Sequence, residues 1–282
     1  MEKIELTEKE REILTLLAQC RYATTKQIVA LYFQDSQHSR TAFRRANLLL
    51  NQIKNRQLIN HLERRIGGVR AGSGSFVWHI TIKGMKALHR PQRFKNKYEP
   101  TAHHLEHTLA VTQAYVFLKL LEEAGKIQLE RFDFEPTCHR TYATFSGKKI
   151  FLKPDAFAQL VLGEYEDSYF YEIDMATESL NRVLNQCKKY IAYYQTGIEQ
   201  REQNGVFPLV LWIVPHDKRK EAISKKIESE LNNFHPMFQV SFFSVFGTDF
   251  VFLPLWMCFY KFGKFDIGYR IFVKLEGFNF NK

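Results

Sequence analysis

The sequence has few cysteines, and its glycines form no phosphate-binding motif. Cys20, Cys138, Cys187 and Cys258 are scattered with no CxxC pair, and there is no Walker motif. The glycines of residues 67–74 belong to a predicted hairpin turn and not to a junction between a strand and a helix. No glycine-rich phosphate loop, Walker motif or CxxC cluster therefore supports a bound cofactor. The scattered cysteines, with a start that lacks an apolar export segment, predict a reducing, cytoplasmic location.

The sequence also has little that suggests a membrane. Residues 250–260 are continuously apolar apart from Pro254, but they are only eleven residues long. A helix needs about 20 apolar residues to span a bilayer. We expect a buried strand or a partner surface here and no membrane association. The aromatic segment 251–282 matches no predicted element.

Acidic residues are almost missing from residues 36–97. This segment has fourteen lysines and arginines against the single acid Glu63, a net charge of +13. The whole chain has a net charge of +10, so all other residues together contribute about −3. Such a concentrated positive field points to a polyanionic partner, double-stranded DNA above all.

The pattern in residues 1–90 predicts a winged helix-turn-helix domain. A capping box formed by Thr7 and Glu10 begins the first helix, and Thr24 or Thr25 caps the second. The predicted elements are helices at 6–19, from 24 or 25 onward and at 39–56, and strands at 58–66 and 76–82 around the glycine-rich turn. A charged, proline-containing linker is expected at 91–102.

The third helix and the hairpin carry the candidate DNA-binding residues. In that helix Ala42, Ala46, Leu49, Leu50 and Ile53 form the predicted buried stripe. The candidates are Arg40, Arg44, Arg45, Asn47 and Asn51 on the helix, Arg64, Arg65 and Arg70 on the hairpin, and Lys83. Helix residues would read base edges and hairpin residues would hold phosphates. The alternative is a protein-docking module whose charged face is only solvated.

Residues 103–250 predict a second domain of the α/β type with a mixed sheet. From Tyr98 onward there are 21 basic and 23 acidic residues, so the charge character changes. Strands are predicted at 128–134, 142–146, 149–162, 168–174, 209–214 and 240–245, and helices at 103–123, 177–194 and 217–232.

Three acids in this domain are predicted to converge. The two-residue period of a strand places Glu172 and Asp174 on one side, and a hairpin can bring Asp155 beside them. A hard cation such as Mg²⁺ or Mn²⁺, held by Asp155 and Glu172, would neutralise the group and activate water against a phosphodiester. The alternative is that the acids are solvated or paired with Arg182 and Lys189.

The segment Pro154-Asp155, followed by Glu172-Ile173-Asp174 and a helix with Gln186 and Tyr190, resembles the PD-(D/E)xK nuclease fold. That resemblance implies catalytic roles for Asp155, Glu172, Asp174 and Gln186. Asp174 stands where the superfamily usually has a lysine. Either a basic residue elsewhere replaces it, with Lys153, Arg182, Lys188 and Lys189 as candidates, or the site is inactive.

The order of short motifs along the chain resembles the replication-relaxation family of plasmids and integrative elements. The motifs are Leu6-Thr7-Glu8-Lys9-Glu10, Arg21-Tyr22-Ala23-Thr24-Thr25, Val77-Trp78-His79-Ile80-Thr81 with Gly84, His107-Thr108-Leu109-Ala110-Val111, Lys153-Pro154-Asp155-Ala156 and Glu172-Ile173-Asp174. The resemblance implies a winged-helix protein that acts at an origin, in replication or in DNA relaxation before conjugative transfer, beside a relaxase or a replication initiator.

The expected function is therefore that of a DNA-binding accessory protein of a mobile element, with dimerisation on paired half-sites compatible but not required. One alternative is a Mg²⁺- or Mn²⁺-dependent nuclease in which Glu106 or Gln186 assists the acids. Another is a winged-helix transcription regulator whose second domain senses a ligand or dimerises.

Overall fold

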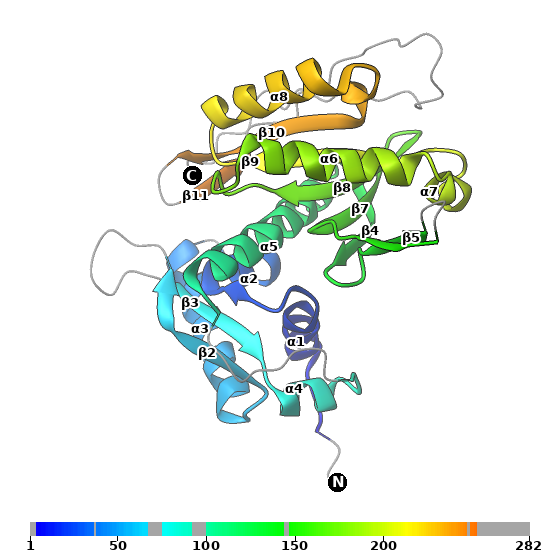
Figure 1. Cartoon of the computed structure of the whole chain (residues 1–282). Coiled ribbons are helices and arrows are strands. Elements are labelled where there is room, and N and C mark those ends of the chain that lie inside the picture. The colour runs from blue at the N-terminus through cyan, green and yellow to red at the C-terminus, as the bar shows by residue number, and fades with distance from the viewer. Residues whose placement is uncertain are drawn as a thin grey trace. The chain divides into compact units, whose positions relative to one another are not determined.

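The computed structural model describes residues 4–36, 38–66, 75–91, 100–143, 147–246 and 249–252, without the side chains of 64–66 and 242–252. The chain divides into two compact units, Met1–Glu123 and Ala124–Lys282 (Figure 1). The predicted turn at 67–74 with Arg70, most of the linker 91–102 and nearly all of the aromatic segment 251–282 lie outside the described residues. None of the described helices is both long and apolar enough to cross a bilayer.

The first unit combines helices with a small antiparallel sheet. Its elements are α1 (Glu8–Cys20), β1 (Ala23–Thr24), α2 (Thr25–Tyr32), α3 (Ser39–Asn55), β2 (Ile59–Ile66), β3 (Ser75–Ile80), α4 (Ile82–Ala87) and α5 (Ala102–Glu123). The strand order is β1-β3-β2, with both pairs antiparallel. A capping box begins α1 at Thr7, as the sequence predicts. A second capping box begins α2 at Thr24, one of the two caps considered for that helix.

Helix α5 differs from expectation, because the sequence places it in the second domain and the division of the chain falls after Glu123. Gln27 of α2 is buried, and its amide nitrogen donates to the carbonyl of Leu109 at 2.9 Å. Thr112 donates its hydroxyl to the carbonyl of Tyr22, also at 2.9 Å. Buried polar groups need such partners, so these bonds join α5 to α2 and to the segment before β1.

The second unit contains a six-stranded mixed sheet. Its elements are β4 (Gln128–Phe134), β5 (Arg140–Ala143), β6 (Lys149–Leu152), β7 (Ala156–Leu162), β8 (Tyr165–Ile173), α6 (Leu180–Tyr194), α7 (Ile198–Glu202), β9 (Leu209–Val214), α8 (Asp217–Leu231), the 3₁₀ helix η1 (Asn232–Met237), β10 (Phe238–Phe246) and β11 (Asp249–Phe252). The strand order is β11-β10-β9-β8-β7-β4, parallel where β9 meets β8 and β10 and antiparallel elsewhere.

One predicted strand of this unit is wrong. Residues 149–162 form two strands, β6 in a hairpin with β5 and β7 in the large sheet. The chain leaves the first hairpin at Lys153-Pro154-Asp155, and proline has no N–H to donate to a ladder. The break places Asp155 immediately before β7.

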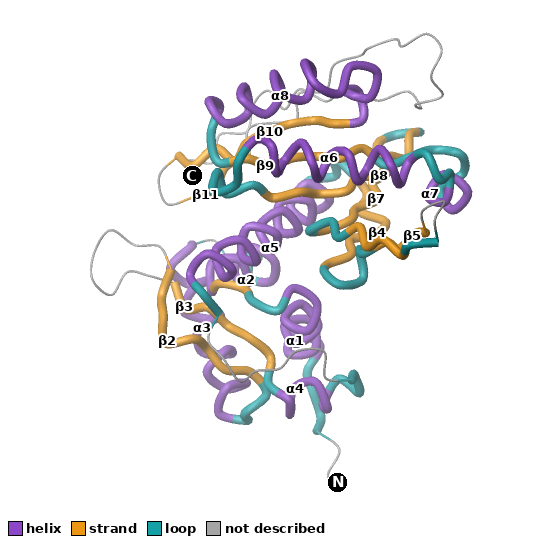
Figure 2. Tube along the Cα trace, in the orientation of Figure 1, coloured by secondary structure: helices purple, strands orange, loops and turns teal. Residues whose placement is uncertain are grey.

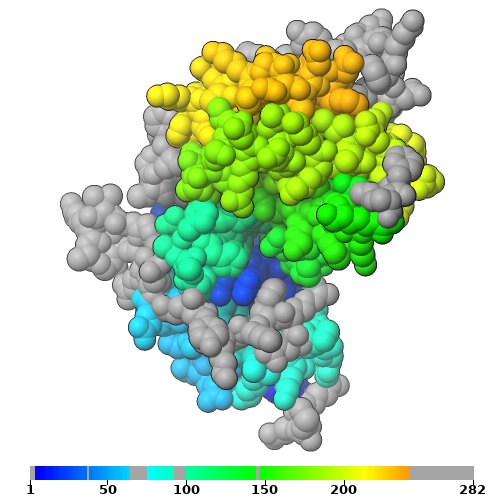
Figure 3. All heavy atoms as spheres, in the orientation of Figure 1, coloured from blue at the N-terminus to red at the C-terminus, as the bar shows by residue number. Residues whose placement is uncertain are grey.

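Helices α6 and α8 cover one face of the large sheet (Figure 2). Phe170 of β8 and Trp212 of β9 point toward them and pack with Tyr190, Cys187 and other buried residues. Figure 3 shows the atoms of α6, in yellow-green, adjoining those of α8, in yellow and orange, on this side of the unit. The strand positions that carry Phe170 and Glu172 therefore face α6.

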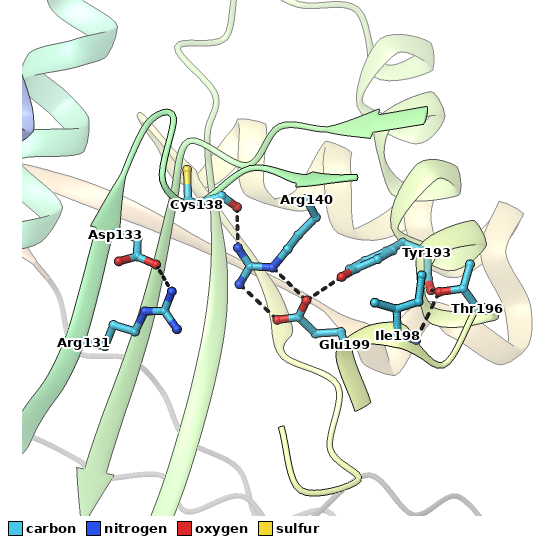
Figure 4. Close-up of polar contacts among 8 residues, drawn as sticks. All are labelled: Arg131, Asp133, Cys138, Arg140, Tyr193, Thr196, Ile198 and Glu199. Carbon is cyan, nitrogen blue, oxygen red and sulfur yellow. Dashed lines mark hydrogen bonds and ion pairs between the residues drawn. The ribbon is translucent and has the colours of Figure 1, made fainter. Parts of the chain in front are cut away.

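A buried ion pair joins β5 to α6 and α7 (Figure 4). Arg140 donates to both carboxylate oxygens of Glu199, at 2.8 and 3.1 Å, and to the carbonyl of Cys138 at 2.9 Å. Tyr193 donates its hydroxyl to the same carboxylate at 2.7 Å. Glu199 is fully buried, so its charge depends on Arg140 for compensation.

Candidate functional site

Helix α3 is amphipathic, which makes one of its sides a candidate surface for a partner. Ala42, Ala46, Leu50 and Ile53 are buried at spacings of three and four, as the sequence predicts, whereas Leu49 is only partly buried. On the opposite side, residues at the same spacings are all exposed. These residues, called here the outer face of α3, are Arg40, Arg44, Leu48, Asn51 and Asn55.

The three arginines predicted for this helix have different surroundings. Arg45 donates to both carboxylate oxygens of Asp35 at 2.9 Å and to the hydroxyl of Ser36 at 2.8 Å. Its guanidinium also lies 5.9 Å from the ring centre of Phe33. Arg40 and Arg44 form no ion pair or side-chain hydrogen bond with any described residue. Arg45 therefore secures the turn between α2 and α3, while the other two are free to bind a ligand.

The structure describes only some of the other predicted DNA-binding residues of this unit. Asn47 is half-buried at the border of the outer face, and Lys83 is exposed in α4. The side chains of Arg64 and Arg65 on β2, like the whole of Arg70, lie outside the described part of the chain.

The second candidate site lies where β7 begins and β8 ends. The backbone N–H of Asp155 donates to the carbonyl of Tyr171 at 2.9 Å, and its carboxylate accepts from the N–H of Ile173 at 2.6 Å. This places the Asp155 carboxylate beside β8, next to Glu172. The structure thus brings together two of the three predicted acids.

Glu172 is buried and faces helix α6. Its Oε1 accepts from the amide of Gln186 at 3.0 Å and from the hydroxyl of Tyr190 at 2.5 Å. Burial, followed by the nearby charge of Asp155, raises the pKa of Glu172 to about 8, although the two hydrogen bonds oppose the shift. Lys189 donates to Gln186 at 2.9 Å and so reaches the acid only through this amide.

Asp174 has a partner of its own, which the sequence analysis missed. Arg219, in the first turn of α8, donates to its two carboxylate oxygens at 2.5 and 3.2 Å, and also to the carbonyl of Glu178. Both charged groups are largely buried. Arg219 lies 45 residues away from Asp174, and no local spacing rule relates the two.

The predicted convergence of three carboxylates is therefore not found. Within the described ranges, no group of three or more His, Cys, Asp or Glu side chains is placed to hold a metal ion. Of the basic residues considered as replacements for the missing lysine, Arg182 pairs with Glu178 at 3.0 Å and Lys189 with Gln186. Glu106, considered as an assisting acid, belongs to α5 of the first unit.

These observations define a two-unit protein of mixed α+β class, with a basic unit and a sheet unit in which Asp155 adjoins the buried Glu172. The model of the replication-relaxation family matches residues 14–210, and the chain belongs to this family. No curated protein and no solved structure matches the chain. The family suggests a role in replication or relaxation of plasmid or other mobile-element DNA.

Proposed function

We propose that the chain is a DNA-binding accessory protein that acts at the origin of a plasmid or integrative element, with its first unit as a winged helix-turn-helix. The order of α1, β1, α2, α3, β2 and β3, with the strand order β1-β3-β2, supports this assignment. In such a domain the third helix enters the major groove and the hairpin between the last two strands lies along the backbone. A relaxase or replication initiator at the same origin is the proposed partner.

The observation that carries the proposal is the exposure of Arg40 and Arg44 without a partner among the described residues. Guanidinium groups that are not paired within the protein are available for phosphate oxygens or for the O6 and N7 atoms of guanine. Their setting is the segment 36–97, with its net charge of +13. So many positive charges in one segment repel one another and destabilise the folded state. A surface that only contacts water would gain nothing to offset this repulsion.

The test begins with selection of bound duplexes from a random pool, followed by affinity measurements on the selected and on an unrelated duplex. Arg44→Ala should weaken binding of the selected duplex by about 10- to 100-fold, the range of a lost bidentate base contact, and weaken the unrelated duplex less. Arg11→Ala, which removes an exposed arginine of α1, is the matched control and should bind as wild type. Failure to select any duplex, or equal losses on both duplexes, would contradict sequence reading by α3.

A metal-dependent nuclease is the second candidate, favoured by the adjacency of Asp155 and Glu172 and by the two α6 side chains that hold Glu172. Weighing against it, each predicted acid already has a partner: a backbone amide for Asp155, Gln186 and Tyr190 for Glu172, and Arg219 for Asp174. We infer that the second unit keeps the shape of a PD-(D/E)xK-like domain and binds DNA or a partner without cutting.

An assay with supercoiled plasmid distinguishes the DNA-binding protein from the nuclease. Incubation with Mg²⁺ or Mn²⁺ should leave the plasmid intact for the wild type and for Asp155→Ala alike. Nicking by the wild type that requires the metal and disappears in Asp155→Ala would establish the nuclease instead. A rise of the unfolding midpoint with added Mn²⁺, lost in the same variant, would show that the acid pair holds a cation.

A further inference from the structure

Leu48 is the one residue of the outer face of α3 that is neither charged nor polar. Its side chain is 59% exposed, more than any other large apolar side chain in the described residues. It follows Arg44 by four positions and precedes Asn51 by three, so it lies on the side opposite Ala46 and Leu50. Packing within the first unit therefore does not explain a leucine here.

The neighbours of Leu48 on the helix surface are all polar. The residues three and four positions away are Arg44, Arg45, Asn51 and Gln52. A protein partner is recognised through a contiguous apolar patch with buried aromatic or aliphatic anchors. A single leucine framed by two arginines and two amides offers no such patch, so a partner of another chemistry is favoured.

The outer face does match the edges of base pairs. Arginine pairs with the O6 and N7 atoms of guanine, asparagine with the N6 and N7 atoms of adenine, and an apolar side chain contacts the C5-methyl group of thymine. At about 1.5 Å per residue, Arg44, Leu48 and Asn51 extend over about 10 Å of helix. That length corresponds to about three base-pair steps of about 3.4 Å.

We propose that Leu48 contacts the C5-methyl group of a thymine in the recognised duplex, between the base read by Arg44 and the base read by Asn51. This inference rests on the proposed function, because it requires that α3 enter the major groove. It assigns the leucine a specificity role: the methyl group distinguishes thymine from cytosine at one position, and the burial of both apolar groups excludes water from the contact.

Uracil substitution tests the inference, because deoxyuridine differs from thymidine only by the missing methyl group. The duplex selected by the wild-type protein is resynthesised with each thymine replaced in turn by uracil, and the affinity of each duplex is measured. We expect one position at which uracil weakens wild-type binding by about fourfold, the effect of one methyl group removed from an apolar contact. Leu48→Ala should bind the thymine and uracil duplexes equally at that position.

Asn51→Ala is the matched control, because it changes the same face but should retain the preference for thymine. Since Leu48 is exposed, Leu48→Ala should unfold at the wild-type midpoint, and thermal unfolding checks this. Wild-type binding that is indifferent to uracil at every position, or a preference that persists in Leu48→Ala, would overturn the assignment of Leu48 alone. A protein that binds no duplex at all would instead overturn the proposed function.

Discussion

Arg44 and Arg45 are adjacent, carry the same charge and differ in what surrounds them. Arg45 is paired with Asp35, whereas Arg44 is exposed and has no described partner. We expect Arg45→Ala to lower the free energy of unfolding by about 0.2–1 kcal/mol, the usual value of an exposed ion pair, and to change DNA affinity little. Arg44→Ala should leave the free energy of unfolding nearly unchanged and should weaken DNA binding. Urea unfolding and duplex affinity, measured for both variants, check the contrast, and similar profiles for the two would contradict it.

This contrast also marks what sequence spacing can predict at the residue scale. The period of α3 placed Ala42, Ala46, Leu50 and Ile53 correctly on its buried side, whereas Asn47 and Leu49, predicted outward and buried, are both half-buried. The partner of Arg45 is ten residues away across a turn, and the partner of Asp174 is 45 residues away on another helix. Pairs of this kind depend on how helices and strands pack against one another. The spacing of residues within one helix or strand does not determine that packing. The exposed Leu48 lies outside the buried stripe, and spacing alone assigns no role to an apolar residue on the outer side of a helix.

The buried carboxyl of Glu172 predicts a pH dependence of stability. Its pKa is raised to about 8 from an ordinary value of 4.5, chiefly by burial. Between these two pH values the folded state holds a proton that the unfolded state has lost, so this group makes stability fall as pH rises. Above about pH 8 the loss is complete, on the order of a few kcal/mol.

Glu172→Gln removes the ionisation and keeps a carbonyl oxygen that can accept from Tyr190. Relative to wild type, the variant should therefore become more stable as pH rises from about 5 to about 8, with no further change above that. Urea unfolding of both proteins at pH 5.5, 7 and 8.5 measures the difference. A difference that stays constant over this range would contradict a buried, protonated Glu172.

At the scale of elements, Gly84 shows why helix α4 lies where it does. A Cβ atom added at this position would lie 2.1 Å from the carbonyl oxygen of Leu58, which also accepts from Thr81. Gly84→Ala should cost about 1–3 kcal/mol of unfolding free energy through overpacking, despite the better helix propensity of alanine. Lys86→Ala, an exposed change in the same helix, should be nearly neutral. Equal or greater stability of Gly84→Ala in urea would show that the close approach is relaxed.

The buried pair of Arg140 and Glu199 makes a second prediction about elements. Arg140→Met leaves the fully buried Glu199 without its counter-charge and should cost about 3–5 kcal/mol. Arg140→Met with Glu199→Leu removes both charges, so the double variant should be more stable than the single one. Urea unfolding of the three proteins measures this, and a double variant less stable than Arg140→Met would indicate that the pair stabilises by more than charge compensation.

Whether a segment forms a helix or a strand was largely predictable. Where each element ends, and to which unit it belongs, was less predictable. The capping box at Thr7 and the apolar strand β9 are local signals, and they were confirmed. For the cap of α2 the sequence left Thr24 and Thr25 open, and the structure has Thr24. The division of residues 149–162 into two strands was not predicted, because residues that favour β-strands lie on both sides of Pro154. The place of α5 in the first unit follows from long-range hydrogen bonds of Gln27 and Thr112, which sequence composition does not reveal.

At the scale of the whole molecule, positive charge is concentrated in one part of the chain. Residues 36–97 have a net charge of +13, and the rest of the chain sums to about −3. This uneven distribution of charge agrees with the proposal that the first unit binds DNA and that the second contacts DNA or a partner. Family membership supports a replication or relaxation role for the whole chain.

If the outer face of α3 binds duplex DNA as proposed, reversing the charge of its two arginines should abolish binding. The wild-type protein, the double variant Arg40→Glu/Arg44→Glu and the control Arg11→Glu are compared for duplex affinity between 50 and 200 mM salt. Wild-type binding should weaken steeply with salt as counterions are released, the control should behave the same way, and the double variant should no longer bind. A double variant that binds as tightly as the control would show that this face of α3 does not contact the duplex.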